Sequence, residues 1–294
     1  MLPTPLSTVI MDGREFLVKR DDLIDPFLSG NKYRKLYTLL HTPSDAISRV
    51  VSYGGTQSNA MLSIAKVCHD KKWEFLYYSK PLSSVQKRSP KGNYRYALEL
   101  GMQHIEIDHT LYKEFIASLT IREDADTLIV HQGGAMAGAK AGVEKLAAEI
   151  KKQVAPGIAL ATPSGTGTTA LFLAHALPQY RIYTTPSVGD ALYLKEQMRS
   201  LAPIPSNLII LQSEKKYAFG KPHPEFLQLY TKLKEQTGIE FDLLYAPLMW
   251  KMLLECTDEK VCYIHSGGVM GNESMIERYG KLGFRVQGLG LEER

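Results

Sequence analysis

The chain has 294 residues, enough for one large domain or two smaller ones, and its hydrophobic content of 44% is ordinary for a globular protein. No apolar segment reaches the length of a membrane span, and a net charge of +4 gives little support for nucleic-acid binding, which usually needs a concentrated basic stripe. The cysteines, Cys68, Cys256 and Cys262, show neither metal-like nor disulfide-like spacing, and the first residues lack the basic and apolar regions of a signal peptide. We therefore expect reduced thiols in a cytoplasmic protein, with no membrane and no nucleic acid as partner.

The first half of the chain alternates short apolar runs with helical patterns. A short strand is predicted within 15–19, and a helix is predicted after Lys32 because Leu36, Leu39 and Leu40 recur at helical spacing. Further strands are expected at 50–53, 75–78, 105–107 and 128–131, and further helices at 58–69, 93–100 and 139–150. This alternation predicts an α/β architecture with a largely parallel sheet.

A second series of the same kind begins near residue 157. Strands are expected at 158–161, 181–184, 208–211 and 261–264, and helices at 168–177, 191–200 and 226–235. Two α/β series predict two domains with a site in the crevice between them. We predict a larger domain from 1–45 and 152–294 and a smaller one from 46–151.

The stretch 29–36, with the sequence SGNKYRKL, places Lys32 at the start of a predicted helix that Ser29 and Gly30 could shape and cap. A lysine held there, and desolvated or set beside other positive charge, has a lowered pKa and can form a Schiff base with a carbonyl. A solvated lysine is the common alternative, because charged side chains are mostly exposed. The charges at 20–22 either form a surface turn or order the loop before Lys32.

Polar, glycine-rich turns follow four of the predicted strands, where open α/β sheets bind their ligands. They lie at 53–59, 131–134, 163–168 and 265–268. In the third turn, Gly165 and Gly167 let backbone N–H groups approach an anion at the start of a helix, and nearby hydroxyls could add donors. This predicts a phosphate cradle without a cation, which excludes the P-loop of nucleoside triphosphatases.

The same turn also matches the dinucleotide-binding fingerprint, because Gly165, Gly167 and Ala170 have the required spacing. That fingerprint needs an acid near the end of the next strand, and the first acid there is Asp190, beyond the expected position. A nicotinamide-dependent oxidoreductase is therefore the least favoured alternative.

Several of these motifs, in this order, resemble the 1-aminocyclopropane-1-carboxylate deaminase and D-cysteine desulfhydrase family. The resemblance runs nearly end to end and includes PTPL at 3–6, KRDDL at 19–23, GNKYRKL at 30–36, GGTQSN at 54–59, GN at 92–93, GG at 133–134 and the phosphate turn. It implies a pyridoxal-phosphate enzyme of fold type II, with two open, twisted, mostly parallel sheets as in the β subunit of tryptophan synthase. It also implies a homodimer, in which the larger domain binds the cofactor.

The resemblance implies a role for each matching residue. Lys32 would carry the cofactor and move protons at the substrate α-carbon, and Ser58 and Tyr245 would complete the candidate catalytic set. The cofactor-binding residues would be Lys32, Asn31, Asn59, Ser164, Gly165, Thr166, Gly167, Thr168 and Ser266. The substrate would contact Thr56, Gln57, Ser58 and Phe219. Ser266 is the candidate partner of the pyridine nitrogen, and no metal site is expected because the histidines lack ligand spacing.

The chain departs from the family pattern at two positions of the substrate wall. Phe219 stands where family deaminases carry a tyrosine, and Ala246 stands where they carry a glutamate after Tyr245. Desulfhydrase relatives usually carry a threonine after this tyrosine, so the chain departs from them too. Opening a cyclopropane ring needs well-placed acid–base groups, so these losses weaken a deaminase assignment.

The sequence therefore predicts a pyridoxal-phosphate-dependent lyase that acts on a small amino acid. A β-elimination like that of D-cysteine desulfhydrase would give an oxoacid and ammonia. The alternatives are a 1-aminocyclopropane-1-carboxylate deaminase, a non-catalytic pyridoxal-phosphate-binding protein and the nicotinamide enzyme weighed above.

Overall fold

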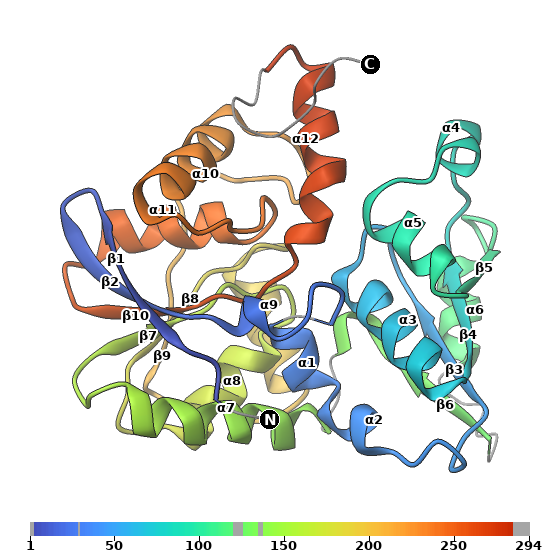
Figure 1. Cartoon of the computed structure of the whole chain (residues 1–294), viewed down its shortest axis with the longest axis horizontal. Coiled ribbons are helices and arrows are strands. Elements are labelled where there is room, and N and C mark those ends of the chain that lie inside the picture. The colour runs from blue at the N-terminus through green and yellow to red at the C-terminus, as the bar shows by residue number, and fades with distance from the viewer. Residues whose placement is uncertain (1–2, 29, 120–125, 135–137, 285–294) are drawn as a thin grey trace.

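The computed structural model describes residues 3–28, 30–119, 126–134 and 138–284. These residues build two separate sheets, each covered by helices, and the segment that carries Lys32 lies between them (Figure 1). Within the described residues, no helix is both long and apolar enough to cross a membrane.

The larger sheet has six strands, and its middle is parallel. Its order is β1 (Leu6–Met11), β2 (Arg14–Lys19), β10 (Val261–Ile264), β7 (Ala159–Ala161), β8 (Ile182–Thr184) and β9 (Leu208–Ile210). Only β1 and β2 pair antiparallel, through a tight turn at Asp12 and Gly13 whose φ angles are both positive, 52° and 75°. Such a turn joins neighbouring antiparallel strands without splaying them.

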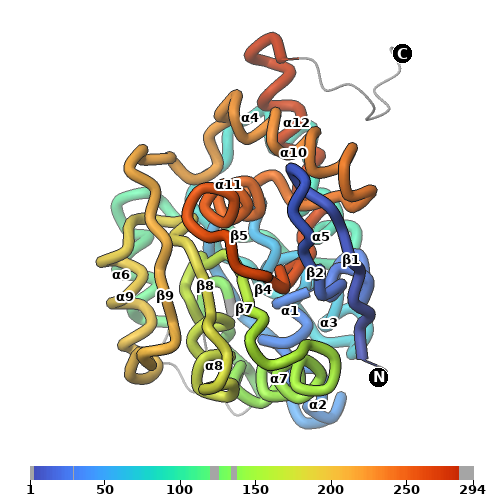
Figure 2. The backbone as a smooth tube through the Cα atoms, turned by 90° about the vertical axis from the view of Figure 1, so that its left-hand side faces the viewer, coloured from blue at the N-terminus to red at the C-terminus, as the bar shows by residue number. Residues whose placement is uncertain are grey.

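Alternate residues of the central strands point into two different cores. In β10, Cys262 and Ile264 pack with one cluster, while Val261 and Tyr263 pack with the other. The first core lies under α7 (Ala139–Gln153), α8 (Thr168–Ala176) and α9 (Ala191–Arg199), and the second under α10 (Pro224–Thr237) and α11 (Ala246–Cys256). Figure 2 shows α11 and α8 on opposite sides of these strands. Helices on both faces explain why the strands are apolar throughout.

The smaller sheet has four parallel strands. Its order is β5 (Gln103–Glu106), β4 (Glu74–Ser79), β3 (Arg49–Tyr53) and β6 (Thr127–Val130). One face packs on α3 (Asn59–Lys71) and α5 (Gly92–Glu99), while Tyr78 contacts Phe115 of α6 (Tyr112–Leu119). The short α4 (Ser84–Arg88) follows β4, and α12 (Asn272–Lys281) follows β10.

The predicted fold class, two mostly parallel sheets, is confirmed, but two details differ from prediction. The single helix expected after Lys32 is two short ones, α1 (Asn31–Lys35) and α2 (Tyr37–His41), which meet at Leu36 with φ −89° and ψ 13°. Residues 139–151, predicted in the smaller domain, belong to α7 and pack on the larger sheet. The remaining domain boundaries stay a prediction, and Ser29 lies outside the described residues.

Candidate active site

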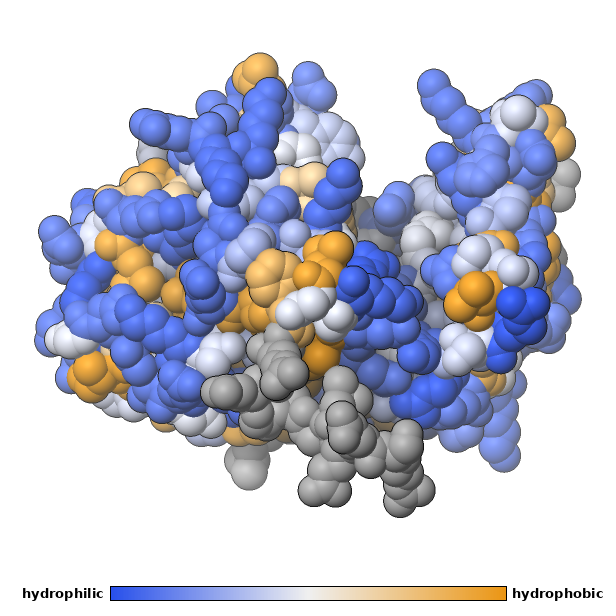
Figure 3. Space-filling view, turned by 90° about the horizontal axis from the view of Figure 1, so that it is seen from above, coloured by the Kyte–Doolittle hydropathy of each residue, from blue (hydrophilic) through white to orange (hydrophobic). Residues whose placement is uncertain are grey.

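A cavity of about 670 Å³ lies between the two sheets, beyond the carboxyl ends of their parallel strands. Seen from above, the surface is hollowed between the two units (Figure 3). Most predicted site residues line this space, which we call the Lys32 cavity: Asn31, Lys32, Gln57, Ser58, Asn59, Gly165, Thr166, Phe219, Tyr245 and Ser266. The predicted residues Thr56, Ser164, Gly167 and Thr168 lie behind its lining.

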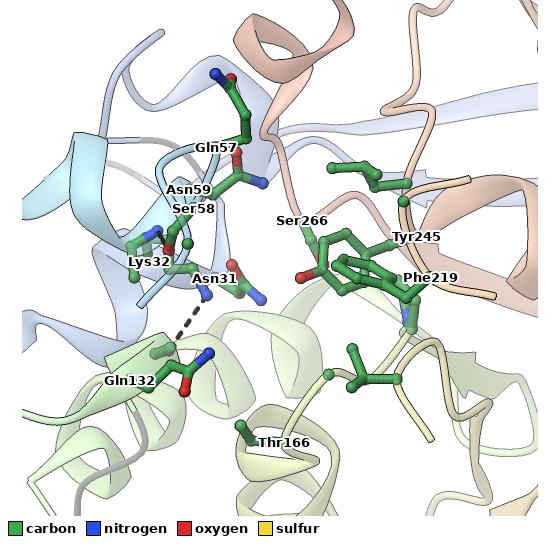
Figure 4. A pocket seen from close by; sticks show the side chains of 18 of the residues that line it. Asn31, Lys32, Gln57, Ser58, Asn59, Gln132, Thr166, Phe219, Tyr245 and Ser266 are labelled. Carbon is green, nitrogen blue, oxygen red and sulfur yellow. Dashed lines mark hydrogen bonds between the residues drawn. The ribbon is translucent and has the colours of Figure 1, made fainter. Parts of the chain in front are cut away.

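Lys32 reaches into the cavity from the first turn of α1. Its Nζ donates a hydrogen bond of 3.2 Å to the carbonyl oxygen of Gly133 (Figure 4). Burial lowers the pKa of the amine to about 8. About a tenth of the amine is therefore unprotonated at pH 7, far more than for an exposed lysine, so it can act as a nucleophile.

The start of α1 is fixed by a close approach to the turn after β10. Gly30 has a φ of +56°, and a Cβ at this position would lie 1.8 Å from the carbonyl oxygen of Ser266. The Asn31 amide donates to the same oxygen at 3.2 Å. Only glycine fits both this backbone conformation and this spacing. The contact places Lys32 and Ser266 on the walls of one cavity.

Arg34 holds the other side of α1 through a buried charge cluster. Its guanidinium, whose side chain is 3% exposed, binds the Asp21 carboxylate through Nε at 3.0 Å and Nη2 at 2.9 Å. It also binds Glu149 through Nη1 at 2.6 Å, and Lys19 donates to Glu149 at 2.8 Å. Two cations and two carboxylates balance one another. Because Asp21 is buried, the charges at 20–22 order the loop before Lys32 and do not form a surface turn.

A second buried lysine corrects the prediction of a phosphate cradle without a cation. Lys35 Nζ lies 3.4 Å from Thr166 Oγ1 in the cradle and 3.4 Å from the Gly133 carbonyl oxygen. Burial, and then the charge of Lys32, hold its pKa well below the ordinary value. A bound phosphate would favour its charged form. The sequence could have indicated this role for Lys35, because it follows Lys32 by three residues and residues three apart lie on the same face of a helix.

The predicted cradle at 163–168 leads directly into α8. Gly167 precedes the helix with a φ of +75°, and the first amides of any helix lack an intrahelical acceptor. The Ser164 hydroxyl is 2.7 Å from Thr184 Oγ1, which donates onward to the carbonyl oxygen of Thr162. Ser164 therefore donates to Thr184 and braces the loop against β8. Contact of Ser164 or Thr168 with a phosphate stays a prediction.

A chain of hydrogen bonds sets the orientation of the Asn59 amide. Asn93 Nδ2 donates 3.0 Å to the Gln57 carbonyl oxygen and 2.7 Å to Asn59 Oδ1. Because a carbonyl can only accept, this atom of Asn93 must be nitrogen, and the facing atom of Asn59 must be oxygen. The Asn59 NH₂ group is thus left toward Gly268, where a Cβ would lie only 2.3 Å from it. Asn59 consequently presents a donor, as a phenolate oxygen of a cofactor ring requires.

Ser58 begins α3 and lines the cavity. Its Oγ accepts from the amides of Ala60 and Met61 at 3.2 and 3.4 Å, which makes it the N-cap of the helix. The Gln57 side chain donates 3.0 Å to the carbonyl oxygen of Lys91. The Ser58 hydroxyl also donates to Tyr77 Oη, because Tyr77 gives its own proton to the carbonyl oxygen of Gly55. Substrate contacts of Thr56, Gln57 and Ser58 stay predictions.

Ser266 carries a buried hydroxyl that has no hydrogen-bond partner within the described residues. Its turn is shaped by His265, whose Nδ1 accepts from the Gly267 amide at 3.1 Å and whose Nε2 donates to the Glu240 carbonyl oxygen at 2.8 Å. Both nitrogens of His265 are therefore occupied, and burial lowers the pKa of its imidazole. An unpaired buried hydroxyl is costly, which suggests that a ligand satisfies it.

The opposite wall contains Tyr245 and Phe219, whose ring centres are 5.1 Å apart (Figure 4). Burial, and then the charge of Asp242, raise the pKa of the Tyr245 hydroxyl. Asp242 Oδ1 accepts from the amides of Leu244 and Tyr245 at 3.0 and 2.6 Å. Ala246 is fully buried in the core beneath α11, so this position contributes no group to the cavity.

Together these residues fit pyridoxal phosphate. Lys32 offers a buried amine, the cradle and Lys35 offer an anion site, Asn59 offers a donor, and Ser266 offers an unpaired hydroxyl. These four features match the aldehyde, phosphate, phenolate and pyridine nitrogen of the cofactor. In the described part of the chain, no cluster of three or more His, Cys, Asp or Glu residues could hold a metal ion.

Several side chains that line the cavity were not predicted as site residues, and two of them, Tyr53 and His131, contact each other. Tyr53 and His131 follow β3 and β6, and Tyr53 Oη lies 3.1 Å from His131 Nδ1. In the sequence, each of them stands at the end of a predicted strand. That position predicts their contact only when β3 and β6 are known to be paired neighbours, which the sequence does not show.

Comparison with known proteins supports the predicted resemblance. No protein-family model matches the chain. A Thermotoga maritima protein named provisionally as a 1-aminocyclopropane-1-carboxylate deaminase is 24% identical over 288 residues, covering 88% of this chain and 90% of that protein. The crystal structure of a homologue of that deaminase has a TM-score of 0.75 and 23% identity, covering 96% of this chain and 93% of that one. The structure of a pyridoxal 5'-phosphate-dependent aspartate racemase has a TM-score of 0.61 and 12% identity, covering 91% and 90%.

The chain therefore shares its fold with solved structures that include a pyridoxal 5'-phosphate-dependent aspartate racemase, as predicted. The predicted resemblance to the 1-aminocyclopropane-1-carboxylate deaminase family is confirmed by one relative and one solved structure that match most of the chain.

Proposed function

We propose that the chain is a pyridoxal-phosphate-dependent lyase that removes ammonia from a small amino acid carrying a leaving group on its β-carbon. The observation that carries this proposal is the buried amine of Lys32, placed in one cavity with an anion site at Lys35 and Thr166. The products would be an oxoacid and ammonia, as in a D-cysteine desulfhydrase.

Bound pyridoxal phosphate supplies a carbonyl that condenses with amines and a ring that withdraws electrons from the substrate α-carbon. The chain's own residues hold and orient the reactants. Lys35 and the start of α8 hold the phosphate, and the Asn59 amide holds the ring oxygen. The Ser266 hydroxyl, which is neutral, holds the pyridine nitrogen without forcing a proton onto it.

Lys32 then moves the proton at the substrate α-carbon. Its lowered pKa of about 8 suits a base that must take up and return a proton near neutral pH. Backbone amides of the turn at 56–58 would bind the substrate carboxylate, and Ser58 would lie beside it. Tyr245 and Phe219, whose rings contact each other, would lie on the other side of the reactants.

The test uses the variants Lys32→Ala and Lys140→Ala, the second on the exposed surface of α7. Addition of pyridoxal phosphate to wild type and to Lys140→Ala should give a visible absorption band. Borohydride should abolish this band and leave the cofactor covalently attached to the protein. Peptide mapping should locate the label at Lys32. A labelled Lys32→Ala variant, or an unlabelled wild type, would refute the assignment. A panel of D- and L-amino acids, assayed for oxoacid and ammonia, then identifies the substrate.

A 1-aminocyclopropane-1-carboxylate deaminase is the second candidate, favoured by the names of the relative and of one solved structure. Phe219 offers no hydroxyl and Ala246 is buried, so the cavity lacks two groups that could assist ring opening. Release of a four-carbon oxoacid from 1-aminocyclopropane-1-carboxylate would favour this candidate. A band that no amino acid shifts would instead favour a non-catalytic pyridoxal-phosphate-binding protein.

The homodimer and the cytoplasmic location remain proposals that rest on the family resemblance and on the cysteines. Cys68, Cys256 and Cys262 are all unpaired in the structure. A light-scattering measurement of the mass of the purified chain would test the dimer directly.

A further inference from the structure

Tyr53 and His131 form a polar pair on the wall of the Lys32 cavity. In the smaller sheet Ser52 is the parallel partner of Val130, so the next residue of each strand lies at the same edge. The two side chains meet there, with Tyr53 Oη 3.1 Å from His131 Nδ1, and both line the cavity. The pair is thus built by strand register and not by a flexible loop.

The hydrogen bond between them can serve two protonation states of the imidazole. The neutral imidazole with its proton on Nε2 accepts the tyrosine proton at Nδ1. The imidazolium, and the neutral ring left once Nε2 has given up its proton, donate from Nδ1 to Tyr53 Oη. The backbone amide of Gln132 also donates to this phenol oxygen, so the oxygen is held in place in either state. Within the part of the chain that the structure describes, His131 Nε2 has no partner. The imidazole can therefore exchange a proton through Nε2 without losing its support at Nδ1.

The same turn connects His131 to Lys32. Only Gln132 separates His131 from Gly133, whose carbonyl oxygen accepts from Lys32 Nζ at 3.2 Å and from Lys35 Nζ at 3.4 Å. His131 is therefore tied by a short, hydrogen-bonded segment to the proposed proton carrier of the α-carbon.

Three other titratable groups that line the cavity, Asp242, Tyr245 and Lys35, are poorly suited to protonate a leaving group. Asp242 accepts from backbone amides at 2.6 and 3.0 Å. Burial raises the pKa of Tyr245, and Lys35 contacts Thr166 of the phosphate cradle. Among the described lining residues His131 is the sole histidine, and an imidazole can both donate and accept a proton through its ring nitrogens.

We propose that His131, positioned by Tyr53, is the general acid that protonates the leaving group; this rests on the proposed lyase function. The proton of the α-carbon passes to Lys32 Nζ, and its electron pair forms the double bond between the α- and β-carbons. The bond between the β-carbon and the leaving atom breaks, and its electron pair stays with that atom. The imidazolium Nε2 proton joins the same atom, so that hydroxide leaves as water and a thiolate leaves as a thiol. The imidazole regains its proton from solvent.

Leaving groups of different basicity test this role. Hydroxide must be protonated to leave, whereas chloride needs no proton. In the holoenzyme of His131→Gln, elimination from serine should fall by about 10²-fold or more, the usual size of general-acid catalysis, while elimination from β-chloroalanine should fall by less than about threefold. Each is assayed with the enantiomer that wild type accepts. Tyr53→Phe should show the same selectivity with a smaller loss.

Equal losses with both substrates, or none with either, would overturn the assignment of His131. Failure of wild type to eliminate even chloride would instead overturn the proposed lyase function. A readout without cofactor or substrate completes the test. Nitrogen-15 NMR of the cofactor-free full chain should show that Tyr53→Phe changes the balance of His131 tautomers, while the melting temperature stays close to that of wild type. An unchanged balance would show that Tyr53 does not position the imidazole.

Discussion

Gly142 lies within α7 at the point where this helix meets α1. A Cβ added there would lie 1.8 Å from the Arg34 carbonyl oxygen and 2.6 Å from the Tyr37 Cβ. Ordinary contacts begin at 3.4 Å, so Gly142→Ala must separate the two helices by about 1.6 Å. Two of the three nearest atoms belong to the backbone, so no side-chain rotation relieves the contact. Because α1 carries Lys32, the separation must also displace the reactive amine.

Two opposing contributions determine how far Gly142→Ala changes the free energy of unfolding. Alanine is favoured over glycine within a helix by about 1 kcal/mol. Overpacking a well-filled contact costs about 1–3 kcal/mol and occasionally more, and here it also stretches the buried ion pairs of Arg34. The difference predicts that Gly142→Ala lowers the free energy of unfolding by up to about 2 kcal/mol, and by more to the extent that the Arg34 ion pairs are stretched. We also expect it to weaken binding of pyridoxal phosphate.

Gly280→Ala provides the matched control, since Gly280 lies in α12 and an added Cβ there meets nothing within 4 Å. This variant should gain up to about 1 kcal/mol, because only the helix preference acts. Urea denaturation of both variants and cofactor titration by fluorescence measure the two effects. If Gly142→Ala gains stability as Gly280→Ala does and binds the cofactor as wild type does, the close packing of α1 on α7 is refuted.

Two further predictions concern charge. Arg34→Met leaves the buried Asp21 without its cationic partner, while Glu149 keeps Lys19, and should cost about 3–5 kcal/mol in urea denaturation. Arg49→Met breaks the ion pair with Glu74, in which both side chains are about a third or more exposed, and should cost at most about 1 kcal/mol. If Arg34→Met and Arg49→Met lost the same stability, the importance of the buried charge cluster would be contradicted. Burial raises the pKa of Asp242 to about 6, against the backbone amides that lower it. The native state then binds this proton more tightly than the unfolded chain, so this group's contribution to stability falls as the pH rises from about 4 to about 6. The free energy of unfolding of Asp242→Asn should lack that fall, and curves that run parallel to those of wild type would refute it.

The strands and helices were largely predictable because the apolar periodicity that indicates them lies within each short segment. Apart from the helix expected after Lys32, which is divided into α1 and α2, every strand and helix expected from apolar periodicity is present in the fold, with ends shifted by a few residues. Strand β1 was missed, although the Asp12–Gly13 pair that follows it is a recognised hairpin signal. Helix α12 was missed because its buried residues, such as Met275 and Tyr279, are sparse among charges.

The candidate site was predictable to the extent that its groups share short motifs. Lys32, Asn59 and the cradle at 163–168 could be found in this way, and each is near the cavity. The partners that orient them could not, because they come from distant parts of the sequence. Asn93 orients Asn59 from another helix, and His131 meets Tyr53 only through strand register. Which distant side chains meet is decided by packing of whole elements, which no local pattern records.

The helix that carries Lys32 shows most clearly why distant residues matter here. Helix α1 has only five residues, and isolated helices shorter than about 12 residues are marginal in water. Its geometry must therefore come from its surroundings: the contact of Gly30 with Ser266 at its start, the ion pairs of Arg34 on one side and the close packing against Gly142. These contacts reach three separate segments of the chain. A substitution in any of them moves the amine, so the position of Lys32 depends on the packing of the larger unit as a whole and not on its own motif.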